Sequence, residues 1–212
     1  TLEDVKAVAA EINSQGLTAE GFACDVSLVA LIEPMVEKVE SAFGPVDILV
    51  NSAGLNIQQY AIDVSEAAWD KVIDVNLKGT FFTAQAVGRR MIPRRQGKII
   101  NISSQMGLVG YYRRSAYCAS KGGVVQLTKV LAVEWAKFNV NVNAVAPTFI
   151  ETEMTGPMFE EGDFREEVLS RIPLGRIGQP DDVTGAVLYL ASDTANLVTG
   201  HTLLVDGGWV AW

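Results

Sequence analysis

The chain has 212 residues, of which 49% are hydrophobic and 20% are charged, and its formal net charge is −8 at pH 7. This length suits a single globular domain over residues 1–212, and an acidic chain with scattered lysines and arginines is not expected to bind nucleic acid. Its longest apolar stretches, such as 185–191, are far shorter than the roughly 20 residues of a membrane span, so a membrane partner is not expected.

The rarer residue types narrow the chemistry and the compartment. Cys24 and Cys118 are far apart and lack metal-ligand spacing, which favours two reduced thiols, a cytoplasmic chain and no metal site. The single histidine, His201, lies in a loop-like stretch, and the sequence holds no G-x-S-x-G motif. A Ser-His-Asp hydrolase is therefore disfavoured, and His201 is interpreted as a surface or turn residue.

Helical and strand patterns alternate along the chain. Hydrophobic spacing predicts helices over about 2–12, 31–43, 66–91 and 116–138, and a further helix that begins at Pro180. Strands are predicted over 19–26, 46–50, 98–102, 140–146 and 203–205. Because short apolar strands bounded by turns suit a sheet covered on both faces, we expect an α/β fold with a doubly wound parallel sheet.

The pattern loosens after Pro147. Residues 148–165 are rich in Glu, Gly, Met and Phe, and two further short helical signals follow. In an open α/β sheet the ligand crevice lies beyond the carboxyl ends of the strands, where this segment is placed. We therefore interpret residues of about 148–175 as a lid over a site.

Three residues indicate a chemistry. Tyr117 and Lys121 are one helical turn apart, and Ser104 follows the predicted strand 98–102. An ammonium four residues after a tyrosine stabilises the phenolate, which lowers a pKa that is ordinarily about 10. A serine hydroxyl can hydrogen-bond a carbonyl oxygen while the tyrosine transfers its proton, which is acid/base catalysis between a carbonyl and an alcohol. A Tyr-x-x-x-Lys pair alone is also explained by an exposed pair on a helix.

Two further polar signals have alternative explanations. Asn51-Ser52-Ala53-Gly54 ends the predicted strand 46–50, where small and polar residues also serve simply as a turn. Asn76 lies inside a predicted helix, although asparagine lowers helix propensity and competes for backbone hydrogen bonds. A residue that breaks a local rule is a functional candidate, and the alternative is a solvated or helix-bending asparagine.

Taken together, these motifs resemble the short-chain dehydrogenase/reductase family, over the whole chain. The Asn51–Gly54 segment stands where the family commonly has N-N-A-G, followed in order by Asn76, Ser104 and the Tyr117–Lys121 block. The resemblance implies a Rossmann-like fold and an NAD- or NADP-dependent oxidoreductase that interconverts a secondary alcohol and a ketone by hydride transfer.

The resemblance also implies roles for single residues. It makes Tyr117 the acid/base, Ser104 the partner of the carbonyl and of the tyrosine, Lys121 the ribose binder, and Asn76 the organiser of a proton-relay water. Asp25 and Val26 match the family's adenine-contacting strand end, and Thr152 matches the residue that bonds the nicotinamide carboxamide. The implied cofactor contacts are Asp25, Val26, Asn51, Ala53, Gly54, Tyr117, Lys121, Pro147, Ile150 and Thr152.

The sequence departs from the family's pattern at two places. The family usually has Pro-Gly where this chain has Pro147-Thr148, so we expect a more restricted backbone there. The family's first strand, its T-G-x-x-x-G-x-G phosphate loop and its second strand are absent, so the first β-α-β unit is missing from the sequence. We expect either that about 40 residues precede Thr1 in the functional protein or that the chain is a fragment that binds no dinucleotide. The choice between NAD and NADP depends on the missing residues and stays open.

Several questions of substrate and assembly stay open at this stage. The resemblance favours a sugar, a sugar acid or a polyol as the small-molecule substrate, or a 3-oxoacyl compound, and the rival class is a non-catalytic scaffold. Arg113 and Arg114 either recognise a carboxylate or phosphate or, as we favour, are solvated or subunit-contact charges. The resemblance also implies a homotetramer that pairs helices around Phe81 and Val125. The apolar tail 209–212 fits that assembly, unless it folds back on its own subunit.

Overall fold

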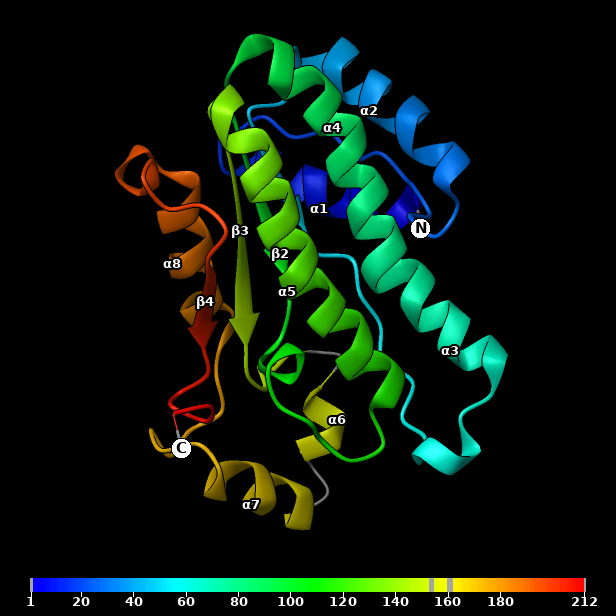
Figure 1. The fold of residues 1–212 in the computed structure, drawn as a ribbon. Helices are drawn as coiled ribbons and strands as arrows, with labels where there is room; N and C mark the ends of the chain where they lie inside the picture. The colour runs from blue at the N-terminus through cyan, green and yellow to red at the C-terminus, as the bar shows by residue number, and fades with distance from the viewer. Residues whose placement is uncertain (1, 153–154, 160–161, 212) are drawn as a thin grey trace.

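The computed structural model describes residues 2–152, 155–159 and 162–211, and its centre is a four-stranded parallel sheet. The strands are β1 (Ile48–Asn51), β2 (Gly97–Ile102), β3 (Val140–Pro147) and β4 (Thr202–Val205), and they lie side by side in this order. Each is joined to the next through helices, as parallel pairing requires. The prediction of an α/β fold with a parallel sheet is confirmed (Figure 1).

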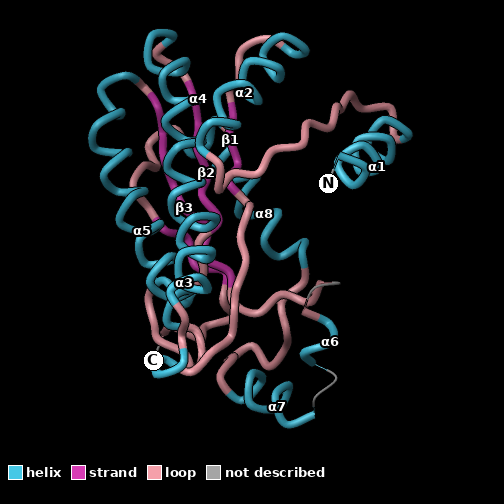
Figure 2. The backbone as a smooth tube through the Cα atoms, turned by 90° about the vertical axis from the view of Figure 1, so that its right-hand side faces the viewer, coloured by secondary structure: helices cyan, strands magenta, loops and turns pink. Residues whose placement is uncertain are grey.

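Helices cover both faces of the sheet. On one face lie α4 (Thr80–Arg94) and α5 (Ser115–Trp135), and α2 (Val29–Phe43) packs against α4. On the other face α8 (Pro180–Ala191) packs against β2, β3 and β4, so the sheet lies between α5 and α8 (Figure 2). The adjacent residues Ile99 and Ile100 show the alternation, because Ile99 joins the core under α4 and α5 and Ile100 the core under α8.

The long helix predicted over 66–91 is one rod with an irregular centre. It consists of α3 (Glu66–Ile73), a π-helical stretch (Asp74–Gly79) and α4. Asn76 lies within the π-helical stretch, so the backbone departs from a regular α-helix where the sequence has its unfavourable asparagine. Such π-bulges are frequent at functional sites.

Two predictions about the first quarter of the chain are wrong. Residues 19–26, predicted as a strand, form an irregular connection between α1 (Leu2–Ser14) and α2, and Figure 2 shows α1 standing away from the sheet. A strand needs a partner for its backbone, and no strand of the described chain pairs with this segment. The strand predicted over 46–50 was expected to be buried on both faces, yet Ile48 and Val50 of β1 are 48% and 41% exposed, because α8 packs against the other three strands.

The segment interpreted as a lid lies beyond the carboxyl ends of β3 and β4, whose arrowheads point toward it in Figure 1. It carries two short helices, α6 (Gly156–Phe159) and α7 (Gly162–Ser170). Their side chains pack with Met106, Phe149 and Trp209 in an apolar cluster of their own. Trp209 is therefore buried within its own chain, and Trp212 lies outside the described residues.

The remaining regular segments are short. Four 3₁₀ turns complete the fold, at Ala61–Asp63, Gln105–Gly107, Ala136–Phe138 and Asp193–Ala195. Cys24 and Cys118 are free thiols, and the His201 side chain is exposed. None of the helices in the described ranges is both long and apolar enough to cross a lipid bilayer.

Candidate active site

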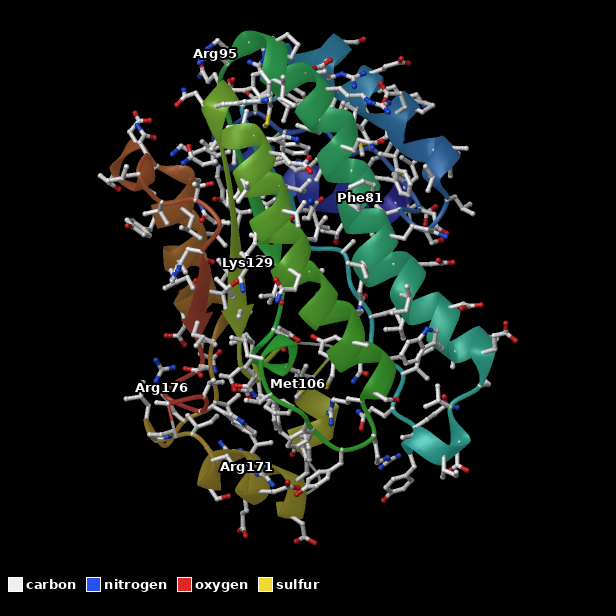
Figure 3. The ribbon with its side chains drawn as sticks, in the orientation of Figure 1. Phe81, Arg95, Met106, Lys129, Arg171 and Arg176 are labelled. Atoms are coloured by element: carbon white, nitrogen blue, oxygen red, sulfur yellow. The ribbon has the colours of Figure 1, made fainter. Side chains whose placement is uncertain are left out.

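A cleft of about 530 Å³ opens at the carboxyl end of the sheet, near Met106 in Figure 3. The ends of β2 and β3, the loop after β1 and the first turns of α5 form its walls. Of the residues that the sequence singled out as catalytic or cofactor-binding, seven line it: Gly54, Ser104, Tyr117, Lys121, Pro147, Ile150 and Thr152.

Ser104, Tyr117 and Lys121 meet in this cleft, as the sequence predicts. Ser104 follows β2 and is the N-cap of a 3₁₀ turn, where its Oγ accepts a hydrogen bond from the backbone N–H of Met106 at 3.2 Å. Tyr117 and Lys121 lie on the same face of α5, and the Lys121 Nζ is 5.8 Å from the centre of the Tyr117 ring. The strand end and the helix therefore supply the hydroxyl, the phenol and the amine to one space.

The pKa of Tyr117 differs from the sequence expectation. Burial raises the pKa of the phenol above its ordinary value of 10, because the phenolate loses its hydration, while the hydrogen bond with Ser104 and the charge of Arg114 act in the opposite direction. We expected Lys121 to lower the Tyr117 pKa, but burial of the phenol is the dominant effect. The ammonium of Lys121 instead donates a hydrogen bond to the backbone carbonyl of Ile102 at 2.8 Å.

Lys121 is itself strongly affected by burial. Its side chain is only 4% exposed, and loss of hydration lowers its pKa from 10.5 to about 8. Ile102 O is its only hydrogen-bond acceptor among the residues described, although an ammonium carries three donors. Two donors thus stay available for a ligand in the cleft.

Asn76 lies behind the cleft wall and is fully buried. Its Oδ1 accepts from the Leu55 N–H at 2.8 Å, and its Nδ2 donates to the Leu55 carbonyl at 2.9 Å and to Ser120 Oγ at 3.0 Å. Through Leu55 it fixes the loop that follows β1, and through Ser120 it links that loop to α5. The absence of a side chain at Gly54 completes this close approach, because a Cβ there would lie 3.4 Å from Lys121 Nζ.

Asn51 is not among the residues that line the cleft, and its expected cofactor contact stays a prediction. Its Nδ2 donates to Asn101 Oδ1 at 2.9 Å, and Asn101 Nδ2 donates to Thr128 Oγ1 at 3.0 Å. This chain of buried amides joins β1, β2 and α5. Sequence reasoning missed Asn101 and Thr128; a buried-strand pattern interrupted by asparagine was the available signal.

The residues matched to the adenine contact also lie outside the cleft lining. Asp25 Oδ1 accepts from the backbone N–H and the hydroxyl of Ser27, at 3.0 and 2.7 Å, and these hydrogen bonds lower its pKa. Val26 packs against Gly79 at the end of the π-helical stretch, where an added Cβ would lie 2.8 Å from Val26 Cγ2. Ala53 is exposed and does not line the cleft.

The loop after β3 forms the opposite wall. Thr152 is exposed at the cleft, where its Oγ1 lies 3.1 Å from Thr155 Oγ1. Ile150 pairs as an isolated bridge with Gly178, which ties this wall to the start of α8. Thr148 occupies the position of the family's glycine without a positive φ, and its buried Oγ1 has no hydrogen-bond partner in the part of the chain that the structure describes.

Arg114 is a residue whose surroundings the sequence did not predict. With Arg113 it was interpreted as a solvated or subunit-contact charge in preference to a carboxylate or phosphate binder, but Arg114 is 4% exposed and lines the cleft. Arg113, its neighbour, is exposed and lies over the Tyr60 ring, 5.4 Å from its centre. The helix start at Ser115 turns the two consecutive arginines in different directions, which no hydrophobic pattern reveals.

Comparisons with known proteins agree with this geometry. The family model described as enoyl-(acyl carrier protein) reductase matches residues 1–210. The chain is 44% identical over 207 residues to the NAD-dependent glycerol dehydrogenase of Listeria innocua, covering 98% of this chain and 80% of that one. It is 44% identical over 212 residues to the 2-dehydro-3-deoxy-D-gluconate 5-dehydrogenase of Dickeya dadantii (100% and 81% covered). It is 48% identical over 179 residues to the 3-oxoacyl-(acyl-carrier-protein) reductase FabG of Thermotoga maritima (84% and 72% covered).

The fold has close counterparts among solved structures. One is a gluconate 5-dehydrogenase from Burkholderia cenocepacia in complex with NADP and tartrate, with a TM-score of 0.96 and 35% identity; the match covers 100% of this chain and 83% of that one. The matched family model, these relatives and the shared fold lead to one assignment. The chain belongs to the short-chain dehydrogenase/reductase family, and the dehydrogenases named above are NAD(P)-dependent oxidoreductases that act on CH–OH groups.

Proposed function

We propose that this chain interconverts a secondary alcohol and a ketone, with Tyr117 as the proton donor and acceptor. The observation that carries the proposal is the meeting of Ser104, Tyr117 and Lys121 in one cleft at the carboxyl end of the sheet. The non-catalytic scaffold weighed as a rival gains no support, because the related proteins named above are enzymes.

The family uses a nicotinamide dinucleotide, and the residues present suit its nicotinamide riboside half. In the described part of the chain, Lys121 has two ammonium donors without a partner, Gly54 leaves room beside them, and the Thr148 hydroxyl is buried without a partner on the opposite wall. When bound, NAD or NADP supplies or accepts the hydride. The sequence contains no T-G-x-x-x-G-x-G stretch, so the proposal assigns no residue to the pyrophosphate.

The protein's own groups manage the proton. In the direction of reduction, the Tyr117 hydroxyl donates a proton to the carbonyl oxygen, and in oxidation the phenolate removes it from the alcohol. A high phenol pKa keeps Tyr117 protonated at neutral pH, ready to act as the acid, and a Lys121 ammonium favours the phenolate that follows. The Ser104 hydroxyl donates a hydrogen bond to the same substrate oxygen and keeps it near Tyr117.

Asn76 has a positioning role in this proposal. Its three side-chain hydrogen bonds are taken up by Leu55 and Ser120, so it holds the loop after β1 against the helix that carries Tyr117 and Lys121. We retain the proton-relay water as a hypothesis for the backbone of the π-helical stretch, which departs from the regular helical hydrogen-bonding pattern at this point.

The substrate class follows from the relatives and from the cleft. The proposed substrates are sugars, sugar acids or polyols, with 3-oxoacyl compounds second, and residues 148–175 are proposed to close over them.

We further propose a homotetramer, for which the exposed Val130 and Val133 on the outer face of α5 offer apolar surface. Val125 itself is 7% exposed in the single chain, so the proposed pairing uses Val130 and Val133 instead.

Replacement of Tyr117 by Phe tests the catalytic proposal. The ring and its packing remain but the proton is lost, so turnover should fall by about 1000-fold. Turnover is followed by dinucleotide absorbance on a panel of polyols, sugar acids and 3-oxoacyl thioesters. Tyr189→Phe is the matched control, because Tyr189 is 44% exposed on α8 and does not line the cleft; it should leave turnover unchanged. Unchanged turnover in Tyr117→Phe would overturn the proposed mechanism.

A further inference from the structure

The guanidinium of Arg114 is buried without a counter-ion. The residue is 4% exposed, and no Asp or Glu of the described chain forms an ion pair with it. Its one hydrogen bond within the described residues runs from Nη1 to the carbonyl of Tyr112, at a long 3.4 Å. An arginine has five N–H donors, so most of them have no partner in this part of the protein. A buried charge in this condition is unfavourable unless something else pairs with it.

Aromatic rings hold the Arg114 side chain in place without satisfying its donors. The guanidinium carbon lies 5.0 Å from the centre of the Tyr111 ring and 5.6 Å from that of Phe149. Such contacts attract the cation through the ring faces and orient a planar group. The N–H groups at the edge of that plane are left for an acceptor, and Arg114 lines the same cleft as Tyr117.

The charges around the cleft point to an anion. Arg114 and Lys121 are the only charged residues that line it within the described ranges, and no carboxylate does, although the whole chain has a formal net charge of −8. The Arg114 charge also acts on Tyr117, where it lowers the phenol pKa against the effect of burial. The Arg114 charge therefore acts on the reacting hydroxyl of Tyr117. No acidic side chain of the described residues pairs with that charge.

We propose that Arg114 binds the carboxylate of the substrate, so that the cleft takes a hydroxy acid or keto acid rather than a neutral polyol or thioester. This assignment rests on the proposed function for its reacting group, and it narrows the substrate to a sugar acid. The planar fork of arginine matches the two oxygens of a carboxylate, and the substrate chain runs from there to Tyr117 and Ser104. A neutral analogue would leave the guanidinium without a charged acceptor, and a site that pairs with a ligand group discriminates against an analogue that lacks it.

Binding of D-gluconate and D-glucitol tests the proposal, because the two share one carbon skeleton and differ in a carboxylate against a hydroxymethyl group. Isothermal titration of the full chain should show gluconate binding at least 10-fold tighter than glucitol. Arg114→Met should remove that preference by weakening gluconate at least 10-fold, about 1.4 kcal/mol, and leaving glucitol unchanged. Arg114→Lys keeps the charge without the fork and should lie between the two.

Arg113→Met is the matched control, because Arg113 is the adjacent arginine but is exposed; it should keep gluconate binding within two-fold. Melting temperatures separate ligand binding from a structural role, since Arg114→Met removes an unpaired buried charge and should melt at or above the wild type. Equal binding of gluconate and glucitol by the wild type would overturn the proposal. So would lower melting temperatures in both Arg114→Met and Arg114→Lys, and so would Arg114-dependent binding of inorganic phosphate tighter than gluconate.

The catalytic proposal and this one fail separately. Tyr117→Phe should abolish turnover and keep gluconate binding, because the carboxylate contact is independent of the proton transfer. Arg114-dependent gluconate binding without turnover of any substrate would retain the anion site and reject the proposed chemistry. Turnover by Tyr117 together with gluconate binding that is insensitive to Arg114→Met would retain the chemistry and reject the anion site.

Discussion

Two sides of the site differ in the hydrogen bonding of their buried polar side chains. On the amide side, formed by Asn51, Asn76, Asn101 and Thr128, each side chain makes at least one hydrogen bond within the protein at 2.8–3.0 Å. On the open side, formed by Arg114 and Thr148, a guanidinium has one long bond and a buried hydroxyl has none. The amide side lies behind the cleft wall and the open side lines the cleft, but the polar atoms of both are buried, so burial alone does not explain the contrast.

This difference in hydrogen bonding separates residues that hold the structure together from residues that bind a ligand. A polar group whose partners are all in the protein is held in place and holds others, whereas one without partners raises the free energy of the empty protein until a ligand supplies them. The amide side is accordingly where the loop after β1 and the catalytic helix are positioned. The open side is where a substrate or cofactor contributes hydrogen bonds.

The largest effect on stability is expected at Asn76. Asn76→Ala removes three hydrogen bonds and leaves the backbone groups of Leu55 and the hydroxyl of Ser120 without their partner. The free energy of unfolding should fall by about 4 kcal/mol, because groups left unsatisfied in a buried place cost more than the bonds contribute. Chemical denaturation measures it.

Asn13 provides a matched control for that substitution. It clamps Ala19 through the same two bonds, accepting from the N–H at 2.8 Å and donating to the carbonyl at 3.0 Å, but it is exposed. Water replaces the lost side chain there, so Asn13→Ala should cost less than about 1 kcal/mol. Similar costs at Asn76 and Asn13 would mean that burial does not give the amide side its role.

The next effect is a pH dependence at Lys121, whose ammonium lies between the two sides. Its pKa is lowered from 10.5 to about 8 by burial, so between these values the unfolded chain holds a proton that the folded chain has released. Stability supplied by this group therefore rises with pH from about 8 to 10.5, by about 3 kcal/mol in all. Below pH 8 both states hold the proton and the contribution is constant.

Comparison with Lys121→Met isolates this contribution. Groups far from Lys121 are common to both proteins, so their contributions cancel in the difference. The difference in unfolding free energy between wild type and Lys121→Met should therefore shift in favour of the wild type above pH 8. A difference that stays flat from pH 7 to 10.5 would show that the lysine keeps its ordinary pKa in the fold.

The fold was largely predictable because apolar periodicity records burial. The four strands of the sheet and the helices at 29–43, 115–135 and 180–191 follow directly from such patterns. Residues 19–26 have the same local pattern. A strand also needs a neighbouring strand to pair with, and the sequence of the segment alone does not reveal whether one is present. Similarly, the apolar pattern predicts that Val50 is a core residue, but it is 41% exposed because α8 packs against the other three strands.

The candidate site was predictable where fixed spacing sets geometry. Tyr117 and Lys121 share a face because they are one helical turn apart, and Ser104 reaches them because chemistry collects at the ends of parallel strands. The surroundings of Arg114 were not predictable, since its burial results from Tyr111 and Phe149 meeting from two distant segments. The hydrogen bond of Asn51 was not predictable either, because its partner, Asn101, is fifty residues away.

The smallest effect gives the sharpest test of the two sides, because one substitution can be made on each. Thr128 Oγ1 accepts from Asn101 Nδ2 at 3.0 Å and donates to the Val124 carbonyl at 2.8 Å, whereas Thr148 Oγ1 is buried without a partner. Valine has nearly the shape of threonine without the hydroxyl. Thr128→Val should therefore lower the free energy of unfolding by about 1–2 kcal/mol, and Thr148→Val should leave it unchanged or raise it slightly.

Thermal and chemical unfolding of the two variants, without ligand, measure this difference. The expected order follows from what each hydroxyl loses: in Thr128→Val the amide of Asn101 is left with an unpaired donor, whereas in Thr148→Val an unpaired group is removed. Equal losses in both variants would show that the Thr148 hydroxyl has a partner in solution, and the contrast between the sides would then reduce to Arg114. A loss at Thr128 alone would establish that the open side is left unsatisfied by the protein itself, which is the condition for a ligand to gain by binding there.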